Sequence, residues 1–165
     1  MIAMKLVGVR VEMPSNSPIV LMQEQADEQR MLPIFIGQAE ATAIALALEE
    51  VEPPRPMTHD LIRDLLVVMG ATVEKVVVTD LRDKTFFAEL HLRSGDVDKV
   101  VSCRPSDALA IAVRTKAPVF AEAHVVDEAG FEPEPDEEPA EEHAEEVLDE
   151  FREFIDSVNP EDFES

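Results

Sequence analysis

The sequence predicts an α+β fold in which a group of strands followed by helices occurs twice. Short apolar runs with strand-like alternation occupy both halves of residues 1–130, and an alanine-rich helical stretch follows each group of runs. At 165 residues and 45% hydrophobic content, the chain has enough apolar material for one domain and an appendage. We therefore expect internally duplicated β3α2-like units forming an antiparallel or mixed sheet, followed by an acidic linker and a C-terminal amphipathic helix.

The first unit begins with three predicted strands arranged as an antiparallel meander. They span 5–13, 19–22 and 31–36, with a turn between the first two at residues 14–18, where prolines flank Ser and Asn. A helix over 38–51 follows, and Pro53-Pro54 ends it. Thr58 is the predicted N-cap of a second helix that ends at Gly70. The predicted core-facing stripe of this second helix consists of Leu61, Leu65, Leu66 and Met69.

The second unit repeats this order of elements. Strands are predicted over 72–81, 85–92 and 99–103, a helix over 106–114 and a final strand over 118–126. When residues 40–46 are laid over 107–113, Glu40 faces Asp107, three alanines coincide and Ile44 faces Ile111. Chance likeness of two alanine-rich helices would also explain this match. The matching strand order before each helix favours an internal duplication.

Charge is distributed unevenly along the chain. The net charge is −22, and residues 131–165 supply −15 of it from sixteen acids and one base. Residues 1–130 therefore form the predicted domain and residues 131–165 the acidic linker and C-terminal helix. That helix is expected to dock on its own domain. The alternatives are docking on a partner subunit and a negative screen beside the active site. Its apolar positions are Val147, Leu148, Phe151, Phe154, Ile155 and Val158.

Several function classes are disfavoured by composition. Residues 1–130 hold twenty acids and thirteen bases, so tight and non-specific binding of nucleic acid is not expected. Cys103 is the single cysteine, which excludes an intrachain disulfide and a cysteine-based metal site, and a packed thiol is expected there. The first residues are apolar only briefly, which predicts neither a signal peptide nor a membrane span and favours the cytoplasm.

Two Arg-Pro elements, each leading into a helix, mark the candidate site. Arg55 and Arg104 are held extended by the proline that follows, and with Arg114 they are the candidate phosphate binders. Thr58 and Ser106 add hydroxyl groups at the two helix starts, with a capping role as the simpler interpretation. The arginines are equally suited to ion pairs that join the two halves of the chain, for example Arg104 with Asp60.

Acidic residues and one histidine accompany these arginines. Asp60, Asp107 and Glu40 each lie near a helix start, where an acid is favoured by the helix dipole alone. If the duplication brings them together, they are candidate ligands of a divalent metal, which would activate water against a phosphodiester. His59 is a candidate general base or ligand, although a hydrogen-bonded structural imidazole is the more common role for such a residue.

The motifs together resemble the bifunctional nuclease domain family. The resemblance covers about residues 5–130, and the closing segments 151–156 and 160–163 resemble the tail of bacterial, particularly actinobacterial, members. Cys103 and Phe87 depart from residues common in the family, without weakening the match. The segments that carry the resemblance are Ile36–Ala41, Glu52–Leu61, Thr85–Ala88 and Arg104–Ala110.

The resemblance implies an α+β fold, a homo-oligomer and hydrolysis of DNA and RNA. The family motif positions are Glu40, Arg55, Thr58, His59, Asp60, Arg104, Ser106 and Asp107. The first hypothesis is therefore a nuclease that uses Mg²⁺ or Mn²⁺, with nucleic acid as substrate. A non-enzymatic interaction or regulatory module is the second hypothesis, and a binder of a small phosphorylated ligand is the third.

Overall fold

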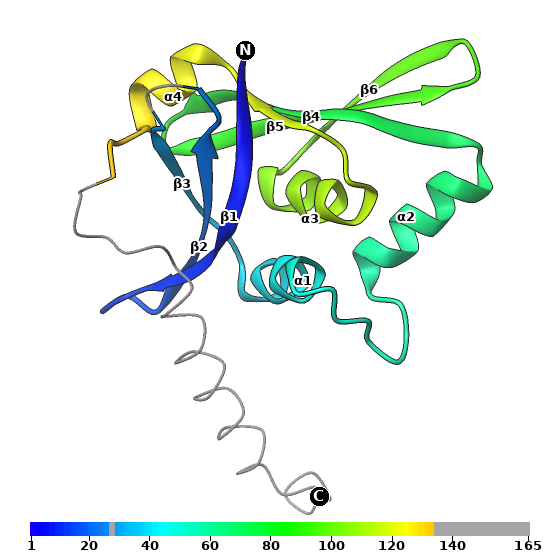
Figure 1. Ribbon diagram of the computed structural model, residues 1–165, viewed down its shortest axis with the longest axis horizontal. Helices are drawn as coiled ribbons and strands as arrows, with labels where there is room; N and C mark the ends of the chain where they lie inside the picture. The colour runs from blue at the N-terminus through cyan, green and yellow to red at the C-terminus, as the bar shows by residue number, and fades with distance from the viewer. Residues whose placement is uncertain (27–28, 134–165) are drawn as a thin grey trace, which may run out of the picture. The chain divides into compact units, whose positions relative to one another are not determined.

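A computed structural model describes residues 1–26 and 29–133, which fold around a seven-stranded mixed sheet (Figure 1). The predicted α+β class is confirmed. The predicted C-terminal amphipathic helix, with its apolar positions from Val147 to Val158, and most of the acidic linker lie outside the described residues. The elements, in chain order, are β1 (Ile2–Glu12), β2 (Ser17–Glu24), β3 (Met31–Phe35), α1 (Gln38–Leu48), α2 (Thr58–Val68), β4 (Ala71–Arg82), β5 (Thr85–Ser94), β6 (Val97–Cys103), α3 (Pro105–Thr115), β7 (Val119–Ala121) and α4 (Ala123–Ala129).

The strands lie in the order β3-β2-β1-β7-β4-β5-β6. β1 to β3 form one antiparallel meander and β4 to β6 form another. The three-residue strand β7 joins them, because it pairs antiparallel with β1, with Ile2 opposite Ala121, and parallel with β4, with Val76 opposite Val119. Each meander is followed by a helix, as the predicted repeat requires. The duplication itself stays a prediction.

The long helices follow the same lateral order as the strands they cover. α1 contacts β1 and β2, α3 contacts β4 and β5, and α3 packs against both α1 and α2. α3 is therefore the central helix, and α2 lies on its other side, next to the end of the sheet where β4 begins (Figure 1). This arrangement brings the N-terminal turns of the three helices within reach of one another.

The core consists of small and branched side chains, which explains the alanine-rich helix faces. One cluster joins β1, β2 and β3 to α1, α3 and α4, and a second joins β4 and β5 to α3. Ala108, Ala110 and Ala112 of α3 are all at most 2% exposed. Alanine at these positions lets the α3 backbone approach the sheet and α1 closely, because no longer side chain separates them.

Three local predictions were wrong. The strand predicted over 118–126 ends at Ala121, and α4 begins at Ala123. The helix buries both Val125 and Val126, at 0% and 1% exposed, whereas a strand would point one of these neighbours away from the core. The N-cap of α2 is Met57 rather than Thr58, and Asp60 completes the cap by accepting the Met57 N–H through Oδ2 at 2.9 Å.

The third difference concerns the outer face of α2. Leu61, Leu65 and Met69 were predicted to face the core but are 54%, 50% and 73% exposed. α2 instead buries His59 and Asp60 and packs Ile62 against the second core cluster. Within the described ranges, no helix is long and apolar enough to cross a bilayer.

Candidate functional site

Residues from the starts of three helices form the candidate site. Glu40 lies in the first turn of α1, His59 in the first turn of α2 and Asp107 in the first turn of α3, while Arg104 is the N-cap of α3. Pro105 at the first position of α3 fixes the backbone just after Arg104, which suits both the helix start and a defined position for that side chain. We call Glu40, His59, Arg104 and Asp107 the N-terminal cluster.

Arg104 links the two acids that the repeat predicted to approach one another. Its Nη2 donates to Glu40 Oε1 at 2.8 Å and to Asp107 Oδ1 at 3.0 Å, while its Nε donates to Asp107 Oδ2 at 2.7 Å. These hydrogen bonds raise the pKa of Arg104, those to Asp107 more than that to Glu40. The side chain is nevertheless 66% exposed, and its Nη1 donates to none of the described residues. The guanidinium can therefore still receive an anion from solvent.

His59 is held by Asp107. Its Nε2 lies 3.2 Å from Asp107 Oδ1, and the histidine side chain is 10% exposed. Burial opposes ionisation of Asp107, but the hydrogen bonds from Arg104 and then from His59 prevail and lower the pKa of this carboxyl. The carboxylate therefore stays charged at neutral pH and favours the tautomer with the proton on Nε2. His59 Nδ1 makes no hydrogen bond to the described residues, since the contact of this ring with Asp107 is made by Nε2.

A second, more buried ion pair lies next to the N-terminal cluster and joins α2 to α3. Arg114 Nε donates to Asp60 Oδ1 at 2.6 Å, and the two side chains are 4% and 13% exposed. Arg114 Nη1 also donates to the Ala110 carbonyl at 2.9 Å. Burial alone would raise the pKa of Asp60. The hydrogen bonds from Arg114 and from the Met57 backbone outweigh burial, so the pKa of Asp60 is lowered. The pair ties α2 to α3, and so fixes the position of His59 beside Asp107.

The remaining predicted site residues lie in different surroundings. Arg55 and Thr58 are exposed, and Arg55 makes no hydrogen bond or ion pair within residues 1–26 and 29–133. Ser106 is buried, with 7% of its surface exposed. With the 4% exposure of its side chain and its bonds to Asp60 and Ala110, Arg114 is placed to stabilise the fold. Its predicted contact with phosphate is not favoured by this position.

The pairing of Arg114 with Asp60 was not expected, since Arg104 was considered as the partner of Asp60. A signal for it is present in the sequence. Arg114 follows Asp107 by seven residues, two helical turns, and therefore lies on the same face of α3 that Asp107 turns toward α2. Asp60 lies one residue after His59, so the His59–Asp107 hydrogen bond and the Arg114–Asp60 ion pair both join the same two helices.

The fit of these residues to a divalent metal is poor. No group of three His, Cys, Asp or Glu side chains converges as cation ligands within the described part of the chain. The Arg104 guanidinium lies between Glu40 and Asp107, where a bridging cation would have to be, and both Asp60 oxygens accept hydrogen bonds. The predicted ligands Glu40, Asp60 and Asp107 therefore do not form a ready site for Mg²⁺ or Mn²⁺.

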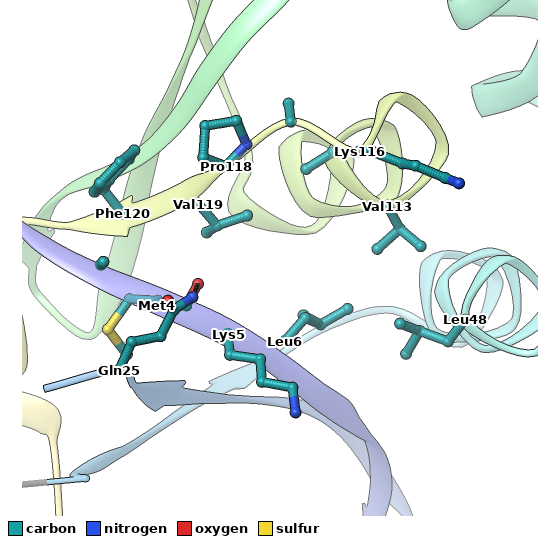
Figure 2. A pocket seen from close by; sticks show the side chains of 13 residues that line it. Met4, Lys5, Leu6, Gln25, Leu48, Val113, Lys116, Pro118, Val119 and Phe120 are labelled. Carbon is teal, nitrogen blue, oxygen red and sulfur yellow. Dashed lines mark hydrogen bonds between the residues drawn. The ribbon is translucent and has the colours of Figure 1, made fainter.

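The cavity beside β1 and β7 lies away from the N-terminal cluster. A shallow cavity of about 430 Å³ opens between β1, β7 and the C-terminal ends of α1 and α3, and none of the predicted site residues lines it. Figure 2 shows apolar walls, including Leu48 and Val113, with Lys5 and Lys116 at the rim. The N-terminal cluster does not line this cavity.

Comparison with known proteins places this sequence in a family. The bifunctional nuclease domain matches residues 19–134, which include the whole N-terminal cluster. The chain belongs to the bifunctional nuclease domain family. An uncharacterized protein of Mycobacterium tuberculosis is 46% identical over 163 residues, covering 98% of this chain and 97% of that protein. The family resemblance seen in the motifs is thus confirmed.

Plant relatives carry the family name. Bifunctional nuclease 2 of Arabidopsis thaliana is 36% identical over 107 residues, covering 63% of this chain and 32% of that protein. Bifunctional nuclease 1 of Oryza sativa subsp. indica is 24% identical over 139 residues, covering 81% and 41% of the two proteins. The chain therefore spans less than half the length of the plant relatives it matches.

Proposed function

We propose that the chain hydrolyses phosphodiester bonds of nucleic acid at the N-terminal cluster. One observation carries the proposal, which is the contact between His59 and Asp107 beside the exposed guanidinium of Arg104. These groups supply a base held in one tautomer and a cation matched to phosphate within a few ångströms of each other. The names of the plant relatives support the same reaction class.

In this proposal Arg104 binds the scissile phosphate. Its Nη1 is directed to no described residue, so its two hydrogens are available to a phosphoryl oxygen while Nε and Nη2 keep their bonds to Asp107 and Glu40. Because the two acids hold the guanidinium in place, little side-chain entropy is lost on binding. The positive charge then stabilises the extra negative charge that develops on the phosphoryl oxygens.

His59 acts as the general base. With the Nε2 proton directed to Asp107, the lone pair of Nδ1 accepts a proton from the attacking oxygen, which is water or, in RNA, the neighbouring 2′-hydroxyl. The nucleophile forms a new P–O bond and the leaving oxygen departs with the electrons of the broken P–O bond. Glu40 and Asp107 act as positioning groups for Arg104 and His59.

The excess of acidic residues should weaken the binding of nucleic acid. The described domain carries more acids than bases, so nucleic acid is repelled at long range and binding should be weak at low ionic strength compared with that of a basic nuclease.

This charge pattern, with Arg104 and Arg114 both engaged by carboxylates, favours the alternative of a non-enzymatic interaction module. In that case the ion pairs would only lock the helices together, and a homo-oligomer would be the functional form.

A cleavage assay separates the two functions. Purified full-length protein is incubated with labelled single-stranded and double-stranded DNA and RNA oligonucleotides, and products are resolved on a denaturing gel. We expect His59→Ala and Arg104→Met to reduce the cleavage rate at least about a hundred-fold, in the range of general-base and electrostatic effects. His124→Ala is the matched control, because His124 is 59% exposed and contacts Asp80 instead.

Unchanged cleavage in both variants, with melting temperatures equal to wild type, would refute the assignment and indicate a contaminating nuclease. No cleavage and no oligonucleotide binding by the wild type would favour the interaction module. The metal requirement stays a prediction, tested by repeating the wild-type assay with EDTA, with Mg²⁺ and with Mn²⁺. Cleavage that persists in EDTA would place the chemistry on the protein groups alone.

A further inference from the structure

The cavity beside β1 and β7 lies where the two core clusters meet (Figure 2). Met4 on its wall belongs to the first cluster, Ala112 belongs to the second, and Val119 packs against both. The pairing of β1 with β7 ends at Met4 and Val119, so beyond this point no described strand lies between β1 and β4. The fold therefore leaves a gap at this junction, and its volume of about 430 Å³ lies within the range of roughly 300–1,000 Å³ that is common for small-molecule sites.

The walls of this cavity are apolar. Apart from two lysines and Gln25, every lining residue is apolar, and Ala112 and Ala117 contribute only methyl groups. The amide Nε2 of Gln25 donates to the Met4 carbonyl at 3.2 Å, so this side chain is already engaged with the protein. An alkyl group that enters the cavity would displace water mainly from carbon surfaces, which is the condition for hydrophobic binding.

Two lysines at the rim provide charge for the recognition of a ligand. Lys5 lies on β1 and Lys116 lies at the end of α3, on the two sides of the cavity (Figure 2). Most arginines of the described domain form ion pairs with carboxylates, whereas neither of these ammonium groups has a carboxylate partner in the described part of the chain. In a chain with a net charge of −22, two such groups beside one apolar cavity are complementary to an anionic head on an apolar body.

The backbone of Lys116 is a second indication. This residue is the C-cap of α3 and has a φ of 56°, in the left-handed region that glycine adopts with the least strain. The helix dipole favours a positive charge at this position, which is the simpler reason for a lysine here. If the dipole were the only reason, replacement of Lys116 by glycine would affect stability alone and would leave ligand binding unchanged.

We propose that this cavity binds a medium-chain aliphatic carboxylate, with its alkyl chain against the apolar walls and its carboxylate between Lys5 and Lys116. Burial of the alkyl chain supplies the affinity, and the two ammonium groups select the negative head. A neutral or cationic head on the same chain gains no such contact. Because none of the residues of the N-terminal cluster lines the cavity, this site is separate from the proposed cleavage site.

Calorimetric titration of the full-length chain with octanoate, decanoate and dodecanoate, each below its micelle concentration, tests the proposal. We expect one site per chain, and decanoate should bind at least about fivefold more tightly than octanoate because two more CH₂ groups are buried. Decyltrimethylammonium, which has the same alkyl chain and a cationic head, is the control ligand. Since the chain has a net charge of −22, non-specific attraction would favour that cation, whereas the lysines favour decanoate.

Lys116→Gly and Lys84→Gly form a matched pair of variants. Each replaces an exposed lysine in the left-handed region, with φ values of 56° and 63°, and each removes one positive charge, but Lys84 lies in the turn between β4 and β5, outside the cavity. Lys116→Gly should weaken decanoate binding about fivefold, and its melting temperature should be no lower than that of the wild type, because glycine relieves the left-handed strain. Lys84→Gly should leave the affinity unchanged, and Lys5→Met should weaken it to an extent similar to Lys116→Gly.

No measurable binding of the three carboxylates would overturn the proposal. Equal affinities for decanoate and decyltrimethylammonium would overturn it too, because the lysines would then not select the head. An unchanged affinity in Lys116→Gly, or equal losses in Lys116→Gly and Lys84→Gly, would reduce Lys116 to a helix cap and would also contradict the site. The nuclease proposal is independent of these outcomes.

Discussion

The buried pair between Arg114 and Asp60 offers the sharpest test of how the site is held together. Removing one partner of a buried ion pair typically costs about 3–5 kcal/mol, because the other charge stays behind without compensation. The Asp60 side chain is 13% exposed, so water relieves part of this cost, and Arg114 keeps its bond to Ala110. Loss of the helix cap at Met57 adds about 1 kcal/mol. We expect Asp60→Ala to destabilise the fold by about 3 kcal/mol.

Urea unfolding followed by circular dichroism measures this cost. With a slope of about 2 kcal/mol per molar urea, the midpoint of Asp60→Ala should fall by about 1.5 M. Asp80→Ala is the control, because Asp80 pairs with Arg82, which is 65% exposed, and its midpoint should move little. The double variant Asp60→Leu/Arg114→Met should recover part of the loss, since no unpaired charge remains. Equal midpoints for Asp60→Ala and Asp80→Ala would refute the reasoning.

Two further predictions concern titration. The pKa values of Asp60 and Asp107 are lowered in the fold, so the stability that these carboxylates contribute is complete above their ordinary pKa of about 4 and is lost as pH falls below that value. The urea midpoint of the wild type should therefore drop between pH 5 and pH 3, and the midpoint of Asp60→Asn should drop less. Equal drops in the two proteins would contradict this linkage. Partial burial, with the charge of Asp107, raises the pKa of Cys103 to about 11. The native thiol should therefore react with a disulfide reagent at pH 8 at least about a hundred-fold more slowly than in urea. Equal rates in the two conditions would contradict the raised pKa.

Much of the fold could be predicted because the local patterns are strong. The meanders follow from alternating apolar runs separated by turn residues, and α1 and α3 follow from alanine-rich faces with prolines or polar residues at their ends. The strand predicted over 118–126 failed because a short apolar run has no detectable period. Val125 and Val126 read as strand residues, and only the packing of α4 against β3 and β4 shows that they are helical.

Residue types at the candidate site were easier to predict than their pairing. The predicted helix starts contained Glu40, His59 and Asp107, and the repeat predicted that the two acids approach one another. They do so at the Arg104 guanidinium. Which arginine meets which acid depends on the lateral order of the helices over the sheet, which no local pattern encodes. For that reason Arg114 was expected at a phosphate, whereas it lies beneath Asp60.

The short strand β7 has a consequence for how the molecule is made. On the side away from β2, β1 pairs with β7, whose residues 119–121 also pair with β4. During synthesis the first meander therefore leaves the ribosome with the edge of β1 uncovered, and it waits for nearly the whole domain before that edge is closed. Assembly of the two halves, and with it the meeting of Glu40 and Arg104, is thus a late event that truncated chains cannot reach.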